Sequence, residues 1–384
     1  MQGMKRNIYI MYAISLLQGM VFYGPIATLY RAAQGVSVFE ISLIESISLL
    51  LCIALEIPWG ILADKIGYKK TMIICSGLYF LSKIVFWQAE SFGAFLLERI
   101  MLSVVIAGLS GVDSSILFNS CKGKDSQKVF GIYNTLATVG LLFAALVFSS
   151  FVKDNYSMAA FLTVVSYGIA MILSLCLVEV RGEEASRIDI KGFAQVLRTE
   201  LKNKNILLFL FAVAFLNESH DMITVFLNQL QYERCGMSNA AIGYVFVAVS
   251  LVGFAEAKSH VFSKRLGIKL AGAWLFFVAA AACVTLMFTG SAALSVGSVM
   301  LLRLSRSLFT PLQTELQNRQ VKTAFRATTL SVYAMVIDLL TASANLVFGS
   351  LADVHLPLAF GFGALICFAG LFMFLKWYKN NPQI

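Results

Sequence analysis

Charged residues are scarce in this sequence, since Asp, Glu, Lys and Arg make up only 13% of its 384 residues. A soluble domain typically carries roughly 25% charged residues, so an ordinary water-soluble fold is excluded. The seven cysteines stand singly, which predicts neither a disulfide framework nor a zinc site, and we expect them to be small apolar core residues. A Walker loop, a dinucleotide-binding glycine pattern and metal-spaced His or Cys are also lacking, so no cofactor or metal is expected.

Long apolar runs are abundant instead. Hydrophobic residues make up 59% of the chain, and the mean hydropathy is +0.79. A helix needs ~20 mostly apolar residues to cross the ~30 Å hydrocarbon core of a bilayer. The sequence therefore predicts an all-α integral membrane protein with about twelve transmembrane helices. The predicted spans are 7–29, 37–60, 71–89, 94–119, 131–151, 158–179, 205–230, 239–262, 270–289, 294–319, 327–352 and 356–377.

The spans fall into two groups of six, separated by the widest polar break in the chain. At a shift of about 200 residues Gly67 aligns with Gly267, and Gly35 aligns with Gly236, at the same topological places. Internal repeats of this kind are common in transporters, with the solute site near the midplane between the two halves. We predict an N-terminal six-helix bundle at 1–180, a cytoplasmic linker with an amphipathic helix at 181–204, and a C-terminal six-helix bundle at 205–384.

Lysine and arginine are distributed unevenly over the loops. With the N-terminus inside, the outer loops hold only Arg31, Lys153 and Arg234, and most of the remaining basic residues fall in cytoplasmic segments. This bias predicts that both termini are cytoplasmic. Basic loops that face anionic lipid account for the formal charge of +9, so no nucleic-acid partner is expected. We expect a monomer in the plasma membrane, with the lipid bilayer as its surroundings.

A basic loop joins the second and third predicted spans and reads Gly60-Ile-Leu-Ala-Asp64-Lys65-Ile-Gly67-Tyr68-Lys69-Lys70. It resembles the loop signature of the major facilitator superfamily, in which Gly, three residues, Asp, a basic residue, one residue and Gly precede a basic pair. The resemblance implies two pseudo-symmetric six-helix bundles and secondary transport by alternating access. It also implies that the loop stabilises the outward-facing state, through Gly60, Asp64, Lys65, Gly67, Lys69 and Lys70. The second copy is degenerate, with His260 and Lys264 at the positions of Gly60 and Asp64.

Ionisable residues within spans are expensive, at least ~2.5 kcal/mol each on insertion scales, so they indicate function or pairing. The densest cluster is Asn217, Glu218, Ser219, His220 and Asp221 in the seventh span. Two carboxyl groups this close in a low-dielectric site disfavour double ionisation, so one of them can hold a coupling proton, and His220 can do likewise. The alternative is that these residues only tie the seventh helix to its neighbours by hydrogen bonds.

Further polar residues in spans are candidates for the substrate and proton pathway. Arg303 and Arg306 lie three apart in the tenth span, where they could pair with the acids or hold an anionic group of the solute. Arg99 resembles the family's second signature arginine, which is associated with proton coupling. The remaining candidates are Gln18, Tyr23, Asp113 and, more weakly, Asp338. Lys83 is expected to snorkel outward.

The sequence favours a secondary transporter of a small organic solute, with a proton as the expected coupling ion. Efflux of drug-like or amphiphilic compounds is the leading interpretation, motivated by 31 Phe, 13 Tyr and 14 Met. Against it, the family's antiporter signature is missing, because residues 131–148 contain no proline. Uptake of a polar or anionic metabolite is the alternative, motivated by the three arginines. A membrane-embedded enzyme or a receptor is a remote alternative, since no nucleophile–base pair is present and no catalytic residue is predicted.

Overall fold

The computed structural model describes residues 2–121, 126–180, 197–321 and 326–381. Within these residues, twelve helices are long and apolar enough to cross a membrane, which confirms the predicted fold class and number of spans. The first half contains α1 (Gln2–Gly19), η1 (Gly24–Ile26), α2 (Ala27–Ala33), α3 (Val38–Ile66), α4 (Tyr68–Trp87), α5 (Phe92–Leu109), α6 (Val112–Cys121), α7 (Ser126–Val147), η2 (Phe148–Val152) and α8 (Tyr156–Leu175). The second half contains α10 (Lys204–Asp221), η3 (Met222–Leu227), α11 (Asn228–Arg234), α12 (Asn239–Val252), η4 (Gly253–Lys258), α13 (Ser259–Leu266), α14 (Ile268–Phe288), α15 (Ala292–Gln320), α16 (Arg326–Val354) and α17 (Leu356–Lys379).

Local polar residues set where several helices begin. At the start of α3, the Ser37 hydroxyl accepts from the Glu40 amide at 3.1 Å, and the Glu40 carboxylate accepts from the Ser37 amide at 2.8 Å. This reciprocal capping box satisfies two amides that the helix leaves without a partner. The Asn155 side chain accepts from the Met158 amide at the start of α8, at 2.9 Å. Such caps give hydrogen-bond acceptors to backbone N–H groups in the first turn of the helix, which have no partner within the helix.

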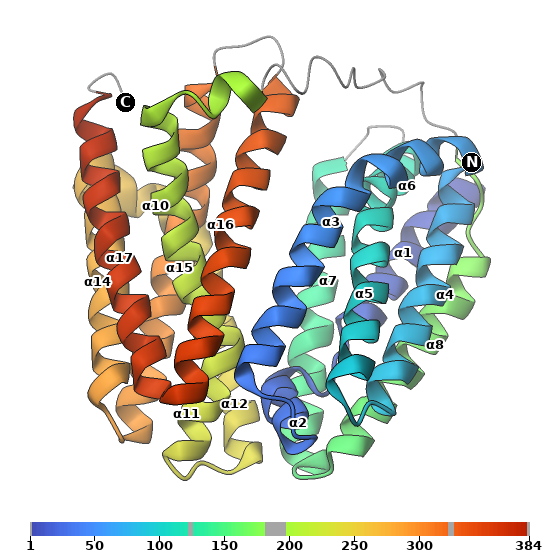
Figure 1. Cartoon of the computed structure of the whole chain (residues 1–384). Coiled ribbons are helices and arrows are strands. Elements are labelled where there is room, and N and C mark those ends of the chain that lie inside the picture. The colour runs from blue at the N-terminus through green and yellow to red at the C-terminus, as the bar shows by residue number, and fades with distance from the viewer. Residues whose placement is uncertain (1, 122–125, 181–196, 322–325, 382–384) are drawn as a thin grey trace. The chain divides into compact units, whose positions relative to one another are not determined.

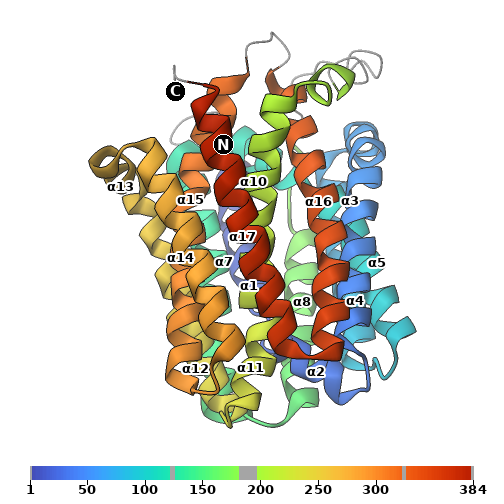
Figure 2. The same ribbon diagram turned by 60° about the vertical axis from the view of Figure 1, so that its left-hand side comes forward.

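The helices form two compact units. The first comprises Met1–Val36, Ile47–Ala185 and Asn239–Val247, and the second comprises Ser37–Ser46, Ser186–Ser238 and Ala248–Ile384. In the first unit, α1 packs against α7 and α8, and α4 packs against α5 and α8 (Figure 1). In the second unit, α17 lies alongside α14, α10 and α16 (Figure 2). The predicted domain boundaries stay a prediction, and of the expected amphipathic helix only residues 197–200 are described, as helix.

Two pairs of glycines support the internal duplication. Gly67 and Gly267 precede α4 and α14 with φ of 94° and 76° and ψ of 150° and 152°. Gly35 and Gly236, which precede α3 and α12, have φ of 79° and 77°. Side chains rarely adopt these backbone angles, so each turn depends on glycine. The same residue therefore solves the same turn at equivalent places in both halves of the chain.

Many large apolar side chains face outward, as expected of a protein solvated by lipid. Phe151, Phe288 and Phe372 are 83%, 77% and 68% exposed. Hydrocarbon chains are as apolar as these side chains, so such exposure has no cost inside a bilayer. The seven cysteines are free, but only Cys75, Cys283 and Cys367 are buried, and Cys176 is exposed. The expectation that all seven are core residues was therefore wrong for Cys176, which follows the end of α8.

Candidate functional site

The polar cluster of the seventh span lies at the end of α10, where the helix changes its winding. The α-helix ends at Asp221 and continues as the π-helical turn η3. Asn217, Glu218, Ser219 and His220 are buried, and the Asp221 side chain is 51% exposed. The first span is interrupted at the equivalent place, because α1 ends at Gly19 and α2 begins only at Ala27. Helices broken in this way often line solute and ion sites in transporters, because irregular backbone needs a polar surrounding.

Both ring nitrogens of His220 have partners. Nδ1 lies 2.6 Å from Oδ1 of Asp221, and Nε2 lies 3.1 Å from Oγ1 of Thr224, one turn further on. The imidazole therefore connects a half-exposed carboxylate with a buried hydroxyl. An imidazole can accept and release a proton, so His220 can exchange one with the Asp221 carboxylate, while the Thr224 hydroxyl hydrogen-bonds the other ring nitrogen and holds the ring in place.

Glu218 is the most enclosed acid of the cluster, with 1% of its surface exposed. Its Oε1 atom has no hydrogen-bond partner among the described residues. It interacts electrostatically with Asp221 and with Glu45, which lies in the segment of α3 that belongs to the same unit. An ionisable carboxyl group enclosed within a span is costly to insert, so Glu218 is a candidate for a functional role.

The two arginines of α15 lie in the electrostatic environment of these acids. Arg303 and Arg306 both interact with Asp221 and His220. The Arg306 guanidinium donates to the Thr310 hydroxyl one turn along the helix. The Arg303 guanidinium packs against Gly253, where a Cβ would lie 2.6 Å from Nη2. We group the residues that interact electrostatically in this way as the α10–α15 cluster: Glu218, His220, Asp221, Arg303 and Arg306.

Asn217 belongs to a separate contact on the same two helices. Its side-chain amide lies 3.4 Å from Oε1 of Gln313, a residue two positions beyond Pro311 in α15. The Asn217 oxygen is buried without a hydrogen-bond partner among the described residues. Asn217 therefore ties α10 to α15 with one side of its amide and leaves the other side available. Asp338, on α16, is half-buried.

The predicted residues of the first half each have hydrogen-bond partners of their own within the first unit. The carbonyl of Gln18 accepts from the Tyr167 hydroxyl at 2.5 Å, at the point where α1 ends. Asp113 lies in the first turn of α6 and accepts from the Ser114 amide at 2.6 Å and from the Tyr133 hydroxyl at 3.4 Å. The carbonyl of Arg99 accepts from the Ser103 hydroxyl at 2.9 Å, and the Arg99 side chain is half-buried.

Tyr23 belongs to a buried network that the sequence interpretation missed. Its hydroxyl accepts from Lys83 Nζ at 3.0 Å, and Lys83 Nζ lies 3.3 Å from Oε1 of Glu98. The side chains of Lys83 and Glu98 are 5% and 1% exposed. The expectation that Lys83 snorkels outward was therefore wrong, because a carboxylate on the next helix compensates its charge inside the unit. A signal was present: Lys83 and Glu98 have opposite charges and flank the short loop between α4 and α5 at similar depths.

The predicted gating loop lies between α3 and α4. Gly67 is the residue before α4, and the Lys69 amide donates to Oε1 of Glu179 at 3.3 Å. A carboxylate at a helix N-terminus is favourable because free amides and the helix dipole both attract it. The surroundings of Gly60 and the side chain of Asp64 lie outside the described part, whereas Lys65 and Lys70 are exposed. Glu179 is thus a loop partner that the motif alone did not indicate.

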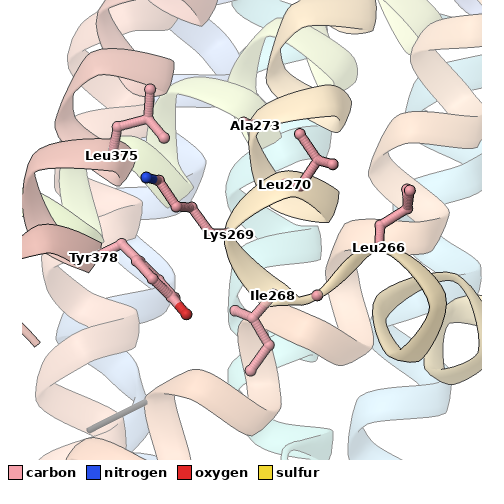
Figure 3. A pocket seen from close by; sticks show the side chains of 8 residues that line it. Leu266, Ile268, Lys269, Leu270, Ala273, Leu375 and Tyr378 are labelled. Carbon is pink, nitrogen blue, oxygen red and sulfur yellow. The ribbon is translucent and has the colours of Figure 1, made fainter. Parts of the chain in front are cut away.

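A pocket of about 420 Å³ lies where α14 begins and α17 ends. Its lining is mostly apolar, with the Lys269 amine extending toward α17 and the Tyr378 ring on the opposite wall (Figure 3). None of the residues predicted to form the substrate and proton pathway lines it. This pocket is therefore not the site built around the α10–α15 cluster.

The twelve apolar helices and the acids and arginines buried among them define a polytopic membrane transporter. A family model described as the Major Facilitator Superfamily matches residues 8–344. The chain belongs to the Major Facilitator Superfamily, whose members transport small solutes and are not enzymes. It is an integral membrane protein.

Several known proteins are similar. An uncharacterised MFS-type transporter of Methanocaldococcus jannaschii is 25% identical over 274 residues, which span 68% of this chain and 66%, just under two thirds, of that protein. The crystal structure of a point mutant of the nucleoside transporter NupG has a TM-score of 0.85 at 15% identity and covers 97% of this chain and 100% of that chain. An inward-facing, unoccupied bacterial homologue of the human lysosomal transporter Spinster has a TM-score of 0.80 at 15% identity, covering 100% of this chain and 97% of that chain. At these identities the structural matches show the fold alone.

Proposed function

We propose that this chain is a proton-coupled secondary transporter in which the α10–α15 cluster carries the coupling proton and contacts the solute. The observation that carries the proposal is the chain of contacts from half-exposed Asp221 through His220 to Thr224, with buried Glu218 beside it. An ionisable group buried in a span indicates function because its insertion is costly. Among the described residues, no other part of the second half concentrates so many buried ionisable groups in one helix turn.

In this proposal the bundles at 1–180 and 205–384 alternate access to the solute from the two sides of the membrane. The basic loop between α3 and α4 stabilises one of the two states, with Lys65, Gly67 and Lys69 as its described parts. The hydrogen bond from the Lys69 backbone amide to the Glu179 carboxylate supports this role, because it ties the loop to the segment that follows α8. A conformational state gains population only through contacts that the other state lacks, so loosening this loop shifts the equilibrium.

The solute that the site supports best is polar, with an anionic or strongly hydrogen-bonding group. Arg303 and Arg306 supply donors on one face of α15, and Asn217 and Gln313 supply neutral polar groups on the same pair of helices. Guanidinium groups suit carboxylate and phosphate because of their forked geometry. Nucleoside transport by NupG, organic anion transport by human MFSD10 and symport of D-xylose with protons by another structural relative are compatible with this solute class.

Efflux of drug-like amphiphiles is the second candidate. Its motivation in the sequence was the abundance of Phe, Tyr and Met. Phe151, Phe288 and Phe372 are among the most exposed large apolar side chains of the described residues. Exposed rings of this kind suit a lipid-facing surface, so a high phenylalanine content alone does not indicate an aromatic binding cavity. Buried Tyr23, which lies just before η1, stacks on Phe86 of α4 with centroids 3.9 Å apart, and Tyr30 of α2 packs against the same Phe86 ring.

We further propose that the protein acts as a monomer in the cytoplasmic membrane, with both termini in the cytoplasm. The distribution of basic residues supports this orientation, because Lys and Arg are retained on the cytoplasmic side of short loops. Lys65, Lys70, Lys264 and Arg265 are exposed at the ends of helices that the orientation places inside.

Counterflow in proteoliposomes tests the transport proposal. Purified protein is reconstituted with a panel of unlabelled nucleosides, sugars, carboxylates and amphiphilic cations inside, and each radiolabelled counterpart is added outside. We expect transient accumulation of at least one polar or anionic solute that depends on the protein. Accumulation of amphiphilic cations alone would favour the second candidate, and absence of counterflow over the whole panel, with folded protein in the vesicles, would contradict the proposed substrate class.

A further inference from the structure

The first unit holds an ammonium group in surroundings that the transport proposal does not use. Lys83 leaves α4 and ends between a carboxylate and a tyrosine hydroxyl, with Nζ at 3.3 Å from Glu98 Oε1 and 3.0 Å from Tyr23. The residue is 4% exposed, so lipid and water are both excluded from it. A buried charge needs both a counter-charge and hydrogen bonds, and this one has both.

Three tyrosine rings complete the surroundings of this ammonium. Nζ lies over the rings of Tyr23, Tyr79 and Tyr167, at 5.7, 5.3 and 5.3 Å from their centroids. The Tyr79 and Tyr167 rings pack edge to face with centroids 4.6 Å apart, so each ring restrains the orientation of the other. Ring faces carry negative charge density, so a cation within about 6 Å is attracted to each of them. Three rings and one carboxylate around one cation are the arrangement by which proteins bind alkylammonium ligands.

The carboxylate has more capacity than Lys83 uses. Glu98 is 1% exposed, and its Oε2 atom has no hydrogen-bond partner among the described residues. An ionised carboxylate can accept about four hydrogen bonds. Tyr23 comes from the segment between α1 and η1, and the other three residues come from α4, α5 and α8. The site is therefore assembled by packing between helices and not by one helix.

We propose that Tyr23, Tyr79, Tyr167 and Glu98 form a cation site that Lys83 fills as a tethered alkylammonium, and that the site takes a free primary alkylammonium when the lysine side chain is removed. In the wild type, the ammonium group of Lys83 is a permanent counter-charge for the buried Glu98 carboxylate, in the place that a bound cation would otherwise take. The inference concerns the first unit alone and is independent of the solute and coupling ion proposed for the second.

Chemical rescue tests this site in the purified full chain. Lys83→Ala deletes the atoms that n-propylammonium contains, and leaves Glu98 without its cation. We expect the midpoint of thermal unfolding to fall by about 5 to 10 °C, because breaking one partner of a buried pair is strongly destabilising. Addition of n-propylammonium chloride should restore at least half of the loss, relative to sodium chloride at the same ionic strength. The wild type, whose site is filled, should show no such shift.

Two controls decide the outcome. The double variant Lys83→Ala with Glu98→Gln keeps the empty space but removes the counter-charge, so n-propylammonium should not stabilise it. An equal shift in the double variant and in Lys83→Ala, or no shift in either, would overturn the proposal. Should Lys83→Ala not fold, Lys83→Met, Glu98→Gln and their combination are compared. The proposal requires the double variant to lose less stability than the two single variants lose together. A loss in the double variant equal to the sum of the two single losses would overturn it.

Discussion

His220 Nδ1 lies 2.6 Å from Asp221 Oδ1, which joins a buried imidazole to a carboxylate that is half exposed. The two groups are adjacent in sequence, yet they differ strongly in their contact with solvent. The carboxylate is the accessible member of the pair and the imidazole the enclosed one, so in the proposed mechanism protons enter at Asp221 and reach His220 from it. This contact is the reason for placing proton transfer in the second half of the chain.

The acids of α10 should be required for coupling and dispensable for exchange. Asp221→Asn combined with Glu218→Gln removes the proton-accepting groups and preserves their shape. Accumulation driven by a pH gradient should fall between about 5- and 150-fold, the range of ordinary coupling free energies, whereas counterflow should be retained at least in part. Glu233→Gln, at the exposed end of α11, serves as the matched control and should behave as the wild type. Unchanged pH-driven accumulation in the double variant would exclude these acids as the proton site.

Arg306 should contribute to solute binding through its charge and its forked geometry. Arg306→Gln is expected to raise the KM for an anionic solute by roughly 10- to 100-fold, the equivalent of one charge-assisted hydrogen bond. Arg306→Lys should recover only part of that loss, because a lysine lacks the fork. Arg319→Gln, at the exposed end of the same helix, is the control. Equal KM values for Arg306→Gln and the control would remove Arg306 from the binding site.

Gly67 should be less tolerant of a side chain than its counterpart in the second half. Both Gly67 and Gly267 have backbone angles that cost other residues of order 1 to 3 kcal/mol. A Cβ on Gly67 would also lie 2.8 Å from the Glu179 carboxylate, whereas one on Gly267 meets nothing within 4 Å. The midpoint temperature of thermal unfolding in detergent should therefore be lower for Gly67→Ala than for Gly267→Ala, and lower for both variants than for the wild type. The opposite ranking would show that Glu179 does not constrain the loop.

The orientation can be tested with single cysteines at exposed positions. Lys153→Cys, in the loop before α8, should react with a membrane-impermeant maleimide in intact cells. Lys269→Cys, at the start of α14, should react only after permeabilisation, because the orientation places it in the cytoplasm. A background in which the native Cys176 is replaced removes the one exposed native cysteine from both measurements. Labelling with the reverse pattern would invert the topology.

The sequence predicted the spans well because the bilayer imposes a length and composition that each helix must satisfy separately. It also aligned Gly67 with Gly267, and both glycines precede a helix with backbone angles that few other residue types adopt. The network around Lys83 was missed for a different reason. Each charge within a span was interpreted singly, whereas the environment of Lys83 depends on which faces of α4, α5 and α8 meet. Those contacts are set by packing between helices, which apolar periodicity does not specify.

The candidate site was only partly predictable for the same reason. Neighbours on one helix face, such as Glu218 and Asp221, follow from their three-residue spacing. The contact between the adjacent residues His220 and Asp221 does not follow from it, because consecutive helical residues point to different faces. The place of Arg306 beside Asp221 follows from packing between α10 and α15, and the sequence alone could offer it only through a family resemblance. The carboxylate of Glu179 at the gating loop lies outside the motif and could not be found from it.

Proton movement that accompanies solute is the most direct test of the account. Proteoliposomes loaded with a pH-sensitive dye receive a solute that has shown counterflow, in the absence of any imposed gradient. The account predicts a change of internal pH that depends on the solute and is lost in the variant with Asp221→Asn and Glu218→Gln. Solute exchange by the wild type with no accompanying change of internal pH would contradict it.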